Sequence, residues 1–220
     1  PGLGNGLNSW IIDQTYILDW ILEQASNLDV SRLILTGDVF EDVVPDQRLI
    51  KIFISWLRNC AEYDIECHVI AGNHDVKRTG SIYTSALDII SAADIENVFV
   101  HKDITTIIDE KAAFTIMPFR DRRSLGHDKV AQSVERLSCA LSYELANMPV
   151  NASRVVVGHL AIQGSFYSNE LDDTANEIMC PNSMFRGYDF VWMGHVHKPQ
   201  VLSKKPHIAQ SFFFLWIHMQ

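Results

Sequence analysis

This sequence of 220 residues has no long apolar run and only four cysteines, and acidic side chains outnumber basic ones. No uninterrupted apolar segment approaches the roughly 20 residues that a membrane-spanning helix needs. The first residues, Pro1 to Gly6, have neither the basic nor the apolar segment of a secretory signal peptide. We therefore expect a protein without membrane contact that works in the cytoplasm.

The cysteines have neither the spacing of a zinc site nor the density of a disulfide scaffold. Free thiols in a reducing compartment are the interpretation that fits this spacing. The four residues are Cys60, Cys67, Cys139 and Cys180.

The formal net charge of −9 argues against a general affinity for polyanions. It does not exclude a nucleic-acid enzyme, because bound divalent cations offset negative charge at the site itself. Any contact with DNA must then come from local basic patches.

Helical and strand-like patterns alternate along the chain, which is typical of an α/β domain. Helical periodicity is expected in four segments: 10–25, 46–62 (with Pro45 suited to the first turn), 82–92 and 127–147. Short apolar runs predict buried strands at 33–36, 68–71, 155–157 and 190–193, and three more short strands between 98 and 117. We expect one domain over residues 1–220, since no linker or repeat interrupts the pattern.

Four short polar motifs, each led by glycine, follow predicted strands. They are Gly37-Asp38, Gly72-Asn73-His74-Asp75, Gly158-His159 and Gly194-His195-Val196-His197. Loops after strand ends are where α/β folds place ligand sites. These side chains are therefore expected to share one rim.

The motifs contain the donor atoms of a divalent metal centre. A carboxylate can bridge two cations, an amide supplies a neutral oxygen, and imidazoles add nitrogen. This mixture favours Mn²⁺, Fe²⁺ or Zn²⁺ over Ca²⁺, and its oxygen ligands also suit Mg²⁺. Two metals about 3.5–4 Å apart can hold a phosphoryl group and activate a water molecule. The expected ligands are Asp38, Asn73, His159, His195 and His197.

His74 follows Asn73 directly, and we expect it to protonate the leaving group. Asp75 is expected to hold the tautomer of that imidazole. A single buried histidine is more often a satisfied core residue than a ligand, but several histidines at strand ends favour the metal centre. Four others lack that context and are expected to be surface or structural residues: His68, His101, His127 and His207.

In this order, the motifs resemble those of the calcineurin-like metallophosphoesterases, and within them the SbcD-type DNA nucleases. The resemblance covers residues 10–209 and is carried by 37–42, 71–75, 158–160 with Gly164, and 193–199. It implies an α/β fold, a two-layer β-sandwich of mixed sheets flanked by helices. It also implies that Asp38 bridges two metals, that Asn73, His159 and His195 complete one site, and that His197 belongs to the other.

The chain departs from this family at its N-terminal end. The family opens with an Asp-x-His strand, which supplies two ligands to the site shared with His197, and no such motif occurs near Pro1. We therefore expect tight binding of at most one metal, weak or absent catalysis, and reduced stability because the missing strand would be central.

The other end of the chain departs from the family as well. Pro206 to Ala209 predicts a strand, and the apolar run 211–217 is either a buried terminal strand or an altered chain end. Because the family's C-terminal capping region is absent, an SbcC-type ATPase partner is inferred only for a longer parent protein. A homodimer is also considered.

Basic side chains near the motifs are candidates for contacts with DNA phosphates. They are Lys77, Arg78, Arg120 and Lys198, whereas Arg122 and Arg123 are better explained as solvated charge. The stretch between His159 and Phe190 is expected to form a long, partly ordered loop near the site.

Three functions are consistent with these features. The first is a Mn²⁺-dependent phosphodiesterase that acts on DNA. The second is a small-molecule or protein phosphoesterase, because the same metal core serves those substrates. The third is a non-catalytic module that binds a metal or a partner, although the presence of His74 beside the ligands argues against it.

Overall fold

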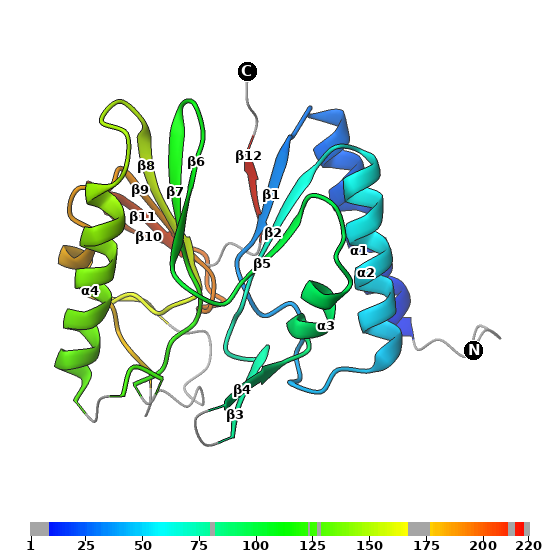
Figure 1. The fold of residues 1–220 in the computed structure, drawn as a ribbon, viewed down its shortest axis with the longest axis horizontal. Coiled ribbons are helices and arrows are strands. Elements are labelled where there is room, and N and C mark those ends of the chain that lie inside the picture. Colours follow the sequence, from blue (N-terminus) through cyan, green and yellow to red (C-terminus); the bar gives the residue numbers. More distant parts are fainter. Residues whose placement is uncertain are drawn as a thin grey trace.

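The computed structural model describes residues 9–79, 82–122, 124–126, 129–166, 177–210 and 214–217. Two β-sheets pack face to face, and helices cover the outer side of each (Figure 1). The predicted fold class, an α/β sandwich of mixed sheets flanked by helices, is confirmed. No described helix has the length and apolar character needed to cross a membrane.

The first sheet has four strands in the order β12-β1-β2-β5. Strands β1 (Arg32–Leu35), β2 (Glu66–Ile70) and β5 (Val98–His101) run parallel, and β12 (Phe214–Ile217) pairs antiparallel with β1. Helices α1 (Ser9–Asn27), α2 (Gln47–Glu62) and α3 (Leu87–Ala92) lie on its outer side (Figure 1). Alternate strand residues such as Leu33 and Val69 pack there against α2 residues such as Trp56 and Leu57.

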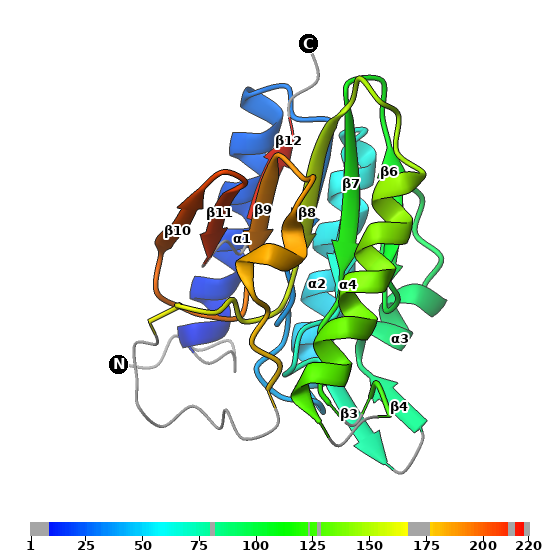
Figure 2. The same ribbon diagram turned by 90° about the vertical axis from the view of Figure 1, so that its left-hand side faces the viewer.

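The second sheet has six strands in the order β10-β11-β9-β8-β7-β6, with α4 (Val130–Ala146) in front of it in Figure 2. Its strands are β6 (Thr105–Ile108), β7 (Ala112–Met117), β8 (Ser153–Gly158), β9 (Phe190–Met193), β10 (Gln200–Lys204) and β11 (His207–Gln210). The four inner strands are parallel and the two edge strands antiparallel. The short 3-10 helix η2 (Asn182–Phe185) packs with α4 on the outer side.

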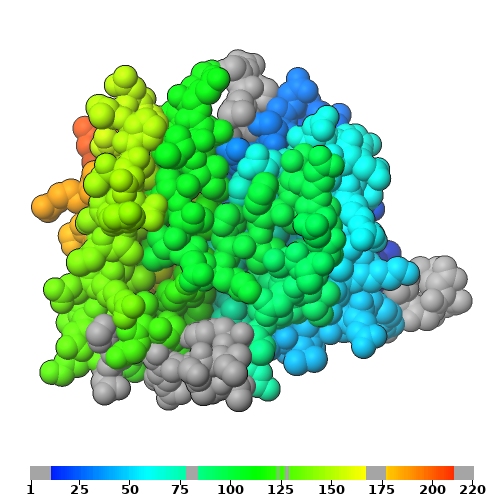
Figure 3. All heavy atoms as spheres, viewed as in Figure 1, coloured from blue at the N-terminus to red at the C-terminus, as the bar shows by residue number. Residues whose placement is uncertain are grey.

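Apolar side chains fill most of the space between the sheets, among them Ile34, Ile70, Phe114, Ile116 and Val157. Figure 3 shows one outer face of the molecule, which is continuous across both layers. Atoms of α4, of the segment from β5 to β7 and of α2 follow one another on it. The core thus holds the strand ends of both sheets in fixed positions relative to each other.

A polar cluster interrupts this interior. Arg32 of the first sheet contacts Glu66 on the neighbouring strand and Asp109, which follows β6 of the second sheet. His68 Nδ1 lies 2.8 Å from His101 Nε2, and the His68 side chain is buried. These two histidines are structural residues, in agreement with the expectation for them.

Most predicted helices and strands form close to their expected positions, with two corrections. The segment 82–92 is helical only from Leu87, because Ile82–Ser85 forms β4, which pairs with β3 (Val76–Thr79). β-Branched and aromatic residues in that stretch favour the hairpin over a helical turn. Pro45 precedes the N-cap Asp46 rather than lying in the first turn of α2.

Residues 214–217 form a strand that pairs with β1, as one of the two expectations for the apolar run required, and the burial of their side chains lies outside the described structure. The four cysteines are free thiols, as expected. His127 lies outside the described residues.

Candidate metal centre

Four of the expected ligands come from loops at the carboxyl ends of strands in both sheets. Asp38 and Asn73 follow β1 and β2 of the first sheet, and His159 and His195 follow β8 and β9 of the second. Since the two sheets face each other, these four loops meet at one end of the sandwich. The site is therefore built jointly by both layers.

The donor atoms of these four side chains converge on one point. His159 Nε2 lies 3.1 Å from Asp38 Oδ2 and 2.9 Å from Asn73 Oδ1. His195 Nδ1 lies 2.7 Å from Asn73 Oδ1 and 3.3 Å from His159 Nε2. Within the described part of the chain, the one group of histidine, cysteine and acidic side chains that could hold a metal is Asp38, His159 and His195. Two nitrogens and two oxygens directed at a common point fit a divalent cation.

Each imidazole has its second nitrogen against an oxygen acceptor. His159 Nδ1 lies 2.7 Å from the carbonyl oxygen of Thr36, which can only accept, so Nδ1 carries the proton and Nε2 presents a lone pair. His195 Nε2 contacts a carboxylate oxygen of Glu177. Such outer hydrogen bonds are usual for metal-binding histidines, because they fix the ring and its tautomer.

The glycines that lead the motifs allow the loops to approach closely. A Cβ on Gly37 would lie 2.2 Å from His159 Nδ1, and one on Gly72 would lie 2.2 Å from the Asp38 nitrogen. A Cβ on Gly194 would lie 2.5 Å from the Thr36 carbonyl oxygen. Any side chain at these positions would push a ligand away from the centre.

The Asp38 carboxylate is held in its ionised form. Burial on its own raises the pKa of Asp38, but the His159 ring, when it is protonated, and the backbone N–H of His74, 2.9 Å from Oδ1, outweigh burial and hold the pKa below its usual value. An anionic oxygen is the donor that a hard or borderline cation prefers.

Comparison with known proteins agrees with this geometry. The sequence profile of the calcineurin-like phosphoesterases matches residues 11–199. The chain belongs to the calcineurin-like phosphoesterase family. Membership implies hydrolysis of phosphoric esters with the help of divalent metal ions.

A curated relative is the SbcD component of the nuclease SbcCD from Staphylococcus saprophyticus, 27% identical over 209 residues. The alignment covers 90% of this chain and 54% of that protein, so the chain spans about half the length of the relative. Among solved structures, the phosphopantetheinyl hydrolase PptH from Mycobacterium tuberculosis is similar over 81% of this chain and 77% of that one. The TM-score is 0.48 and the identity 14%.

Asp75, the last residue of the motif Gly72-Asn73-His74-Asp75, has a different role in the structure from the one expected. Asp75 is fully buried, and its oxygens accept the N–H groups of Gly72, Val39 and Phe40 at 2.8, 3.3 and 3.1 Å. Burial raises the pKa of Asp75, and these three donors oppose that effect. Asp75 therefore joins the first two motif loops rather than orienting His74.

His74 itself is exposed beside the centre. Its Nδ1 lies 3.0 Å from the carbonyl oxygen of Glu41, so a backbone acceptor takes the place expected for the Asp75 carboxylate.

The remaining predicted residues lie outside the converging group. His197 is exposed and is not among the three clustered ligands. Lys77 and Lys198 are exposed, and Lys198 Nζ lies 5.7 Å from the Phe166 ring centroid. The side chains of Arg78 and Arg123 are outside the described part of the structure.

Arg120 is less available for DNA than the sequence suggested. Its guanidinium binds the Phe119 carbonyl oxygen at 2.9 Å, Asp103 at 2.9 Å and the Lys102 carbonyl oxygen. These acceptors include the turn after β5, so Arg120 joins two loops of the fold.

Three residues near the centre carried no signal in the sequence. Glu177 contacts His195, and the Phe119 ring centroid lies 5.9 Å from that of His195. Gln210 is fully buried and donates to the carbonyl oxygens of Leu160 and Gly194 at 2.9 and 3.2 Å. None of them belongs to a polar motif, and only the tertiary contacts reveal them.

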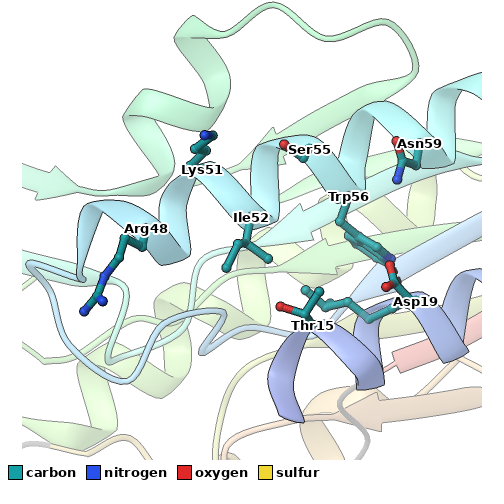
Figure 4. A pocket seen from close by; sticks show the side chains of 9 residues that line it. Thr15, Asp19, Arg48, Lys51, Ile52, Ser55, Trp56 and Asn59 are labelled. Atoms are coloured by element: carbon teal, nitrogen blue, oxygen red, sulfur yellow. Dashed lines mark hydrogen bonds between the residues drawn. The ribbon is translucent and has the colours of Figure 1, made fainter. Parts of the chain in front are cut away.

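A separate pocket of about 380 Å³ lies between α1 and α2 (Figure 4). Thr15 and Asp19 of α1 line one side, and Lys51, Ser55 and Asn59 of α2 line the other. None of its lining residues belongs to the metal motifs, so it is no part of the phosphoesterase site.

Proposed function

We propose that this chain forms the metal-binding part of a Mn²⁺-dependent DNA phosphodiesterase of SbcD type. The observation that carries the proposal is the convergence of Asp38, Asn73, His159 and His195 from both sheets. The nuclease named among its relatives supplies the substrate class.

The side chains have distinct roles in this proposal. Asp38, Asn73, His159 and His195 hold one metal, and His197 together with the shared Asp38 contributes to a second. A metal held by these residues would supply polarisation of the phosphodiester and activation of a water molecule. Two nitrogen ligands beside two oxygens favour Mn²⁺ over Mg²⁺ at this centre.

His74 is proposed as the general acid. When the ring is protonated, its Nδ1–H stays on the Glu41 carbonyl oxygen, and Nε2–H is free to donate to the leaving oxygen of the DNA strand. The exposed position of His74 leaves it accessible to a large substrate.

The proposed DNA contacts are Lys77, Arg78 and Lys198, which flank the second and fourth motifs in sequence. Lysine and arginine at such positions bind phosphates and set the position of the duplex without reading its sequence. Because the relative is a subunit of the nuclease SbcCD, we propose an SbcC-type ATPase as the partner of a longer parent protein. A cytoplasmic location and a homodimer are proposed as well.

The proposal is tested by Mn²⁺-dependent release of nucleotides from a linear duplex. The chain is compared with a longer version in which a strand carrying Asp-x-His precedes residue 1, and with His74→Ala in both backgrounds. We expect activity in the longer version and its loss in His74→Ala. In a separate Mn²⁺ titration, the shorter chain should bind at most one Mn²⁺ ion.

A substrate panel tests the substrate class. Cyclic nucleotides and phosphopeptides are offered to the same proteins under the same conditions. Hydrolysis of either of these, without hydrolysis of DNA, would contradict the nuclease assignment and keep the phosphoesterase family. No hydrolysis and no metal binding in either version would contradict the catalytic assignment as a whole.

A further inference from the structure

Glu177 lies against the outer edge of the His195 ring. The contact joins Glu177 Oε1 to His195 Nε2, and the two side chains are only 7% and 15% exposed. An ionised carboxylate is costly to bury unless a donor satisfies it. The His195 N–H is a donor of this kind.

The opposite edge of the same ring faces the metal centre. His195 Nδ1 lies 2.7 Å from Asn73 Oδ1 and 3.3 Å from His159 Nε2. Glu177 is absent from the group of potential ligands formed by Asp38, His159 and His195 in the described structure. Glu177 thus contacts the edge of the ring that faces away from the metal centre and is not itself one of the potential ligands.

The chain that follows Glu177 is firmly anchored. Ile178 and Cys180 are fully buried, and the backbone of Cys180 pairs with that of Ile162, just beyond β8, in an isolated parallel β-bridge. The Cys180 N–H donates to the Ala161 carbonyl oxygen at 2.9 Å. The carboxylate is therefore presented to His195 from backbone fixed beside the loop that carries His159.

We propose that Glu177 is a positioning residue that holds His195 in the tautomer protonated at Nε2. A carboxylate accepts and does not donate, so the proton at this contact lies on Nε2 and Nδ1 keeps its lone pair for the metal. This inference rests on the proposed metal centre and adds to it a residue outside the motifs. The Thr36 carbonyl oxygen does the same for His159, with the roles of the two ring nitrogens exchanged.

The first measurement reads the tautomer directly, in the metal-free chain. Nitrogen-15 NMR of labelled histidine distinguishes the protonated from the unprotonated ring nitrogen, and comparison with His195→Asn assigns the His195 signals. We expect a single Nε2–H form in the native chain and a mixture of both tautomers in Glu177→Ala. A single Nε2–H tautomer in Glu177→Ala would overturn the proposal.

The second measurement is the Mn²⁺ affinity by titration calorimetry. Loss of such an outer partner typically weakens metal binding by about 10- to 100-fold, and we expect this range for Glu177→Ala. Glu177→Gln keeps an oxygen acceptor, so its loss should be smaller. Glu135→Ala removes an exposed acid of α4 and serves as the matched control, with unchanged affinity.

The outcomes separate this inference from the proposed function. Native affinity in both Glu177 variants would overturn the positioning role and leave the metal centre intact. Failure of the native chain to bind Mn²⁺ would contradict the proposed function, and the tautomer measurement would still decide the role of Glu177. Thermal unfolding of each variant shows whether weaker binding comes with a folded chain.

Discussion

At the scale of single residues, the centre depends on glycines, which have no side chain, as much as on the polar side chains. Gly37, Gly72 and Gly194 lie where a Cβ would meet a ligand, a ligand backbone or the acceptor that orients His159. A motif of glycine followed by a polar residue is therefore a packing requirement at this site, since the four loops approach within van der Waals distance.

Gly72→Ala tests this requirement. The added Cβ would lie 2.2 Å from both the backbone nitrogen and the Oδ1 of Asp38, so the carboxylate must move. We expect Mn²⁺ affinity to fall at least about tenfold, as for other losses of ligand geometry. Gly164→Ala is the control, because open space surrounds a Cβ there although its φ of +93° costs stability. Equal affinities in the two variants would contradict the close-approach argument.

At the scale of elements, the loops after β8 and β9 are joined by a residue from β11. The buried Gln210 amide donates to the carbonyl oxygens of Leu160 and Gly194 and accepts from the Ser165 hydroxyl. Leu160 follows His159, and Gly194 precedes His195. One side chain therefore sets the spacing of the two loops that carry the imidazoles.

Gln210→Leu keeps the volume of the side chain and removes its donors. Two buried carbonyl oxygens would lose their partner, which we expect to cost about 2–4 kcal/mol of unfolding free energy and to weaken Mn²⁺ binding. Urea unfolding measures the first effect and calorimetry the second. The control is Gln132→Leu on the exposed side of α4. Stability equal to that control would show that the Gln210 bonds are dispensable.

Helices and strands were predicted correctly where local periodicity was strong. The prediction failed where pairing with another strand determines the secondary structure. Helices α1, α2 and α4 and the buried strands form near their expected bounds, because each has a continuous apolar stripe or run. Residues 82–85 form a strand because β3 lies beside them, and a window over a single segment contains no information about that partner.

At the scale of the whole molecule, the centre is a junction between the two sheets. Asp38 and Asn73 belong to one layer and His159 and His195 to the other, so a bound cation would join both. Ligands that bind only the folded state stabilise it by mass action. Metal binding should therefore stabilise the sandwich as a unit.

Thermal unfolding with and without Mn²⁺ tests this coupling. At a free Mn²⁺ concentration of about 100 times Kd, stabilisation by about 2.7 kcal/mol corresponds to a rise in Tm of roughly 5–10 °C for a domain of this size. His195→Gln should abolish the rise. The same rise in that variant would place the bound metal elsewhere on the protein.

The polar cluster between the sheets should make stability depend on pH. Burial lowers the pKa of His68, and burial together with His68 lowers the pKa of His101 to about 4. The groups that face this pair are Glu66, Arg32, Asp109 and the stacked Phe99 ring. Unfolded histidine titrates near pH 6.5, at about its reference pKa.

Between that pH and about 4, the unfolded chain binds protons that the folded chain does not. The stability that comes from neutral histidine is therefore complete above pH ~6.5 and is lost as the pH falls toward ~4. We expect a loss on the order of 1–2 kcal/mol from His101 between neutral pH and pH ~5. Urea unfolding at both pH values measures it.

His101→Gln should reduce this pH dependence, and His74→Gln, which replaces an exposed imidazole, should leave it unchanged. Identical pH dependence in the native chain and in His101→Gln would assign the effect to other groups. Ionised Glu66 also stabilises the folded chain, and this contribution is lost as the pH falls further. Burial raises its pKa, but Arg32 and His68 outweigh burial and hold the pKa below its usual value.

The sequence by itself determined the α/β class and which polar side chains follow the strands, because both are local properties; the two-layer sandwich was expected only from the resemblance to the phosphoesterases. A buried strand followed by glycine and a polar residue is visible in a short window, and parallel strands bring such windows to one end of a sheet. Asp38, Asn73, His159 and His195 could therefore be identified before their contacts were known.

Only the tertiary structure decided which atoms meet at the centre. It directed Asp75 to backbone N–H groups, assigned the His74 ring to the Glu41 carbonyl oxygen, and brought Glu177 and Gln210 to the loops that bear the imidazoles. These contacts join segments far apart in the chain, and their geometry depends on how two sheets pack. A local pattern of residue types determines the chemistry that is available, whereas packing determines the partner of each polar atom.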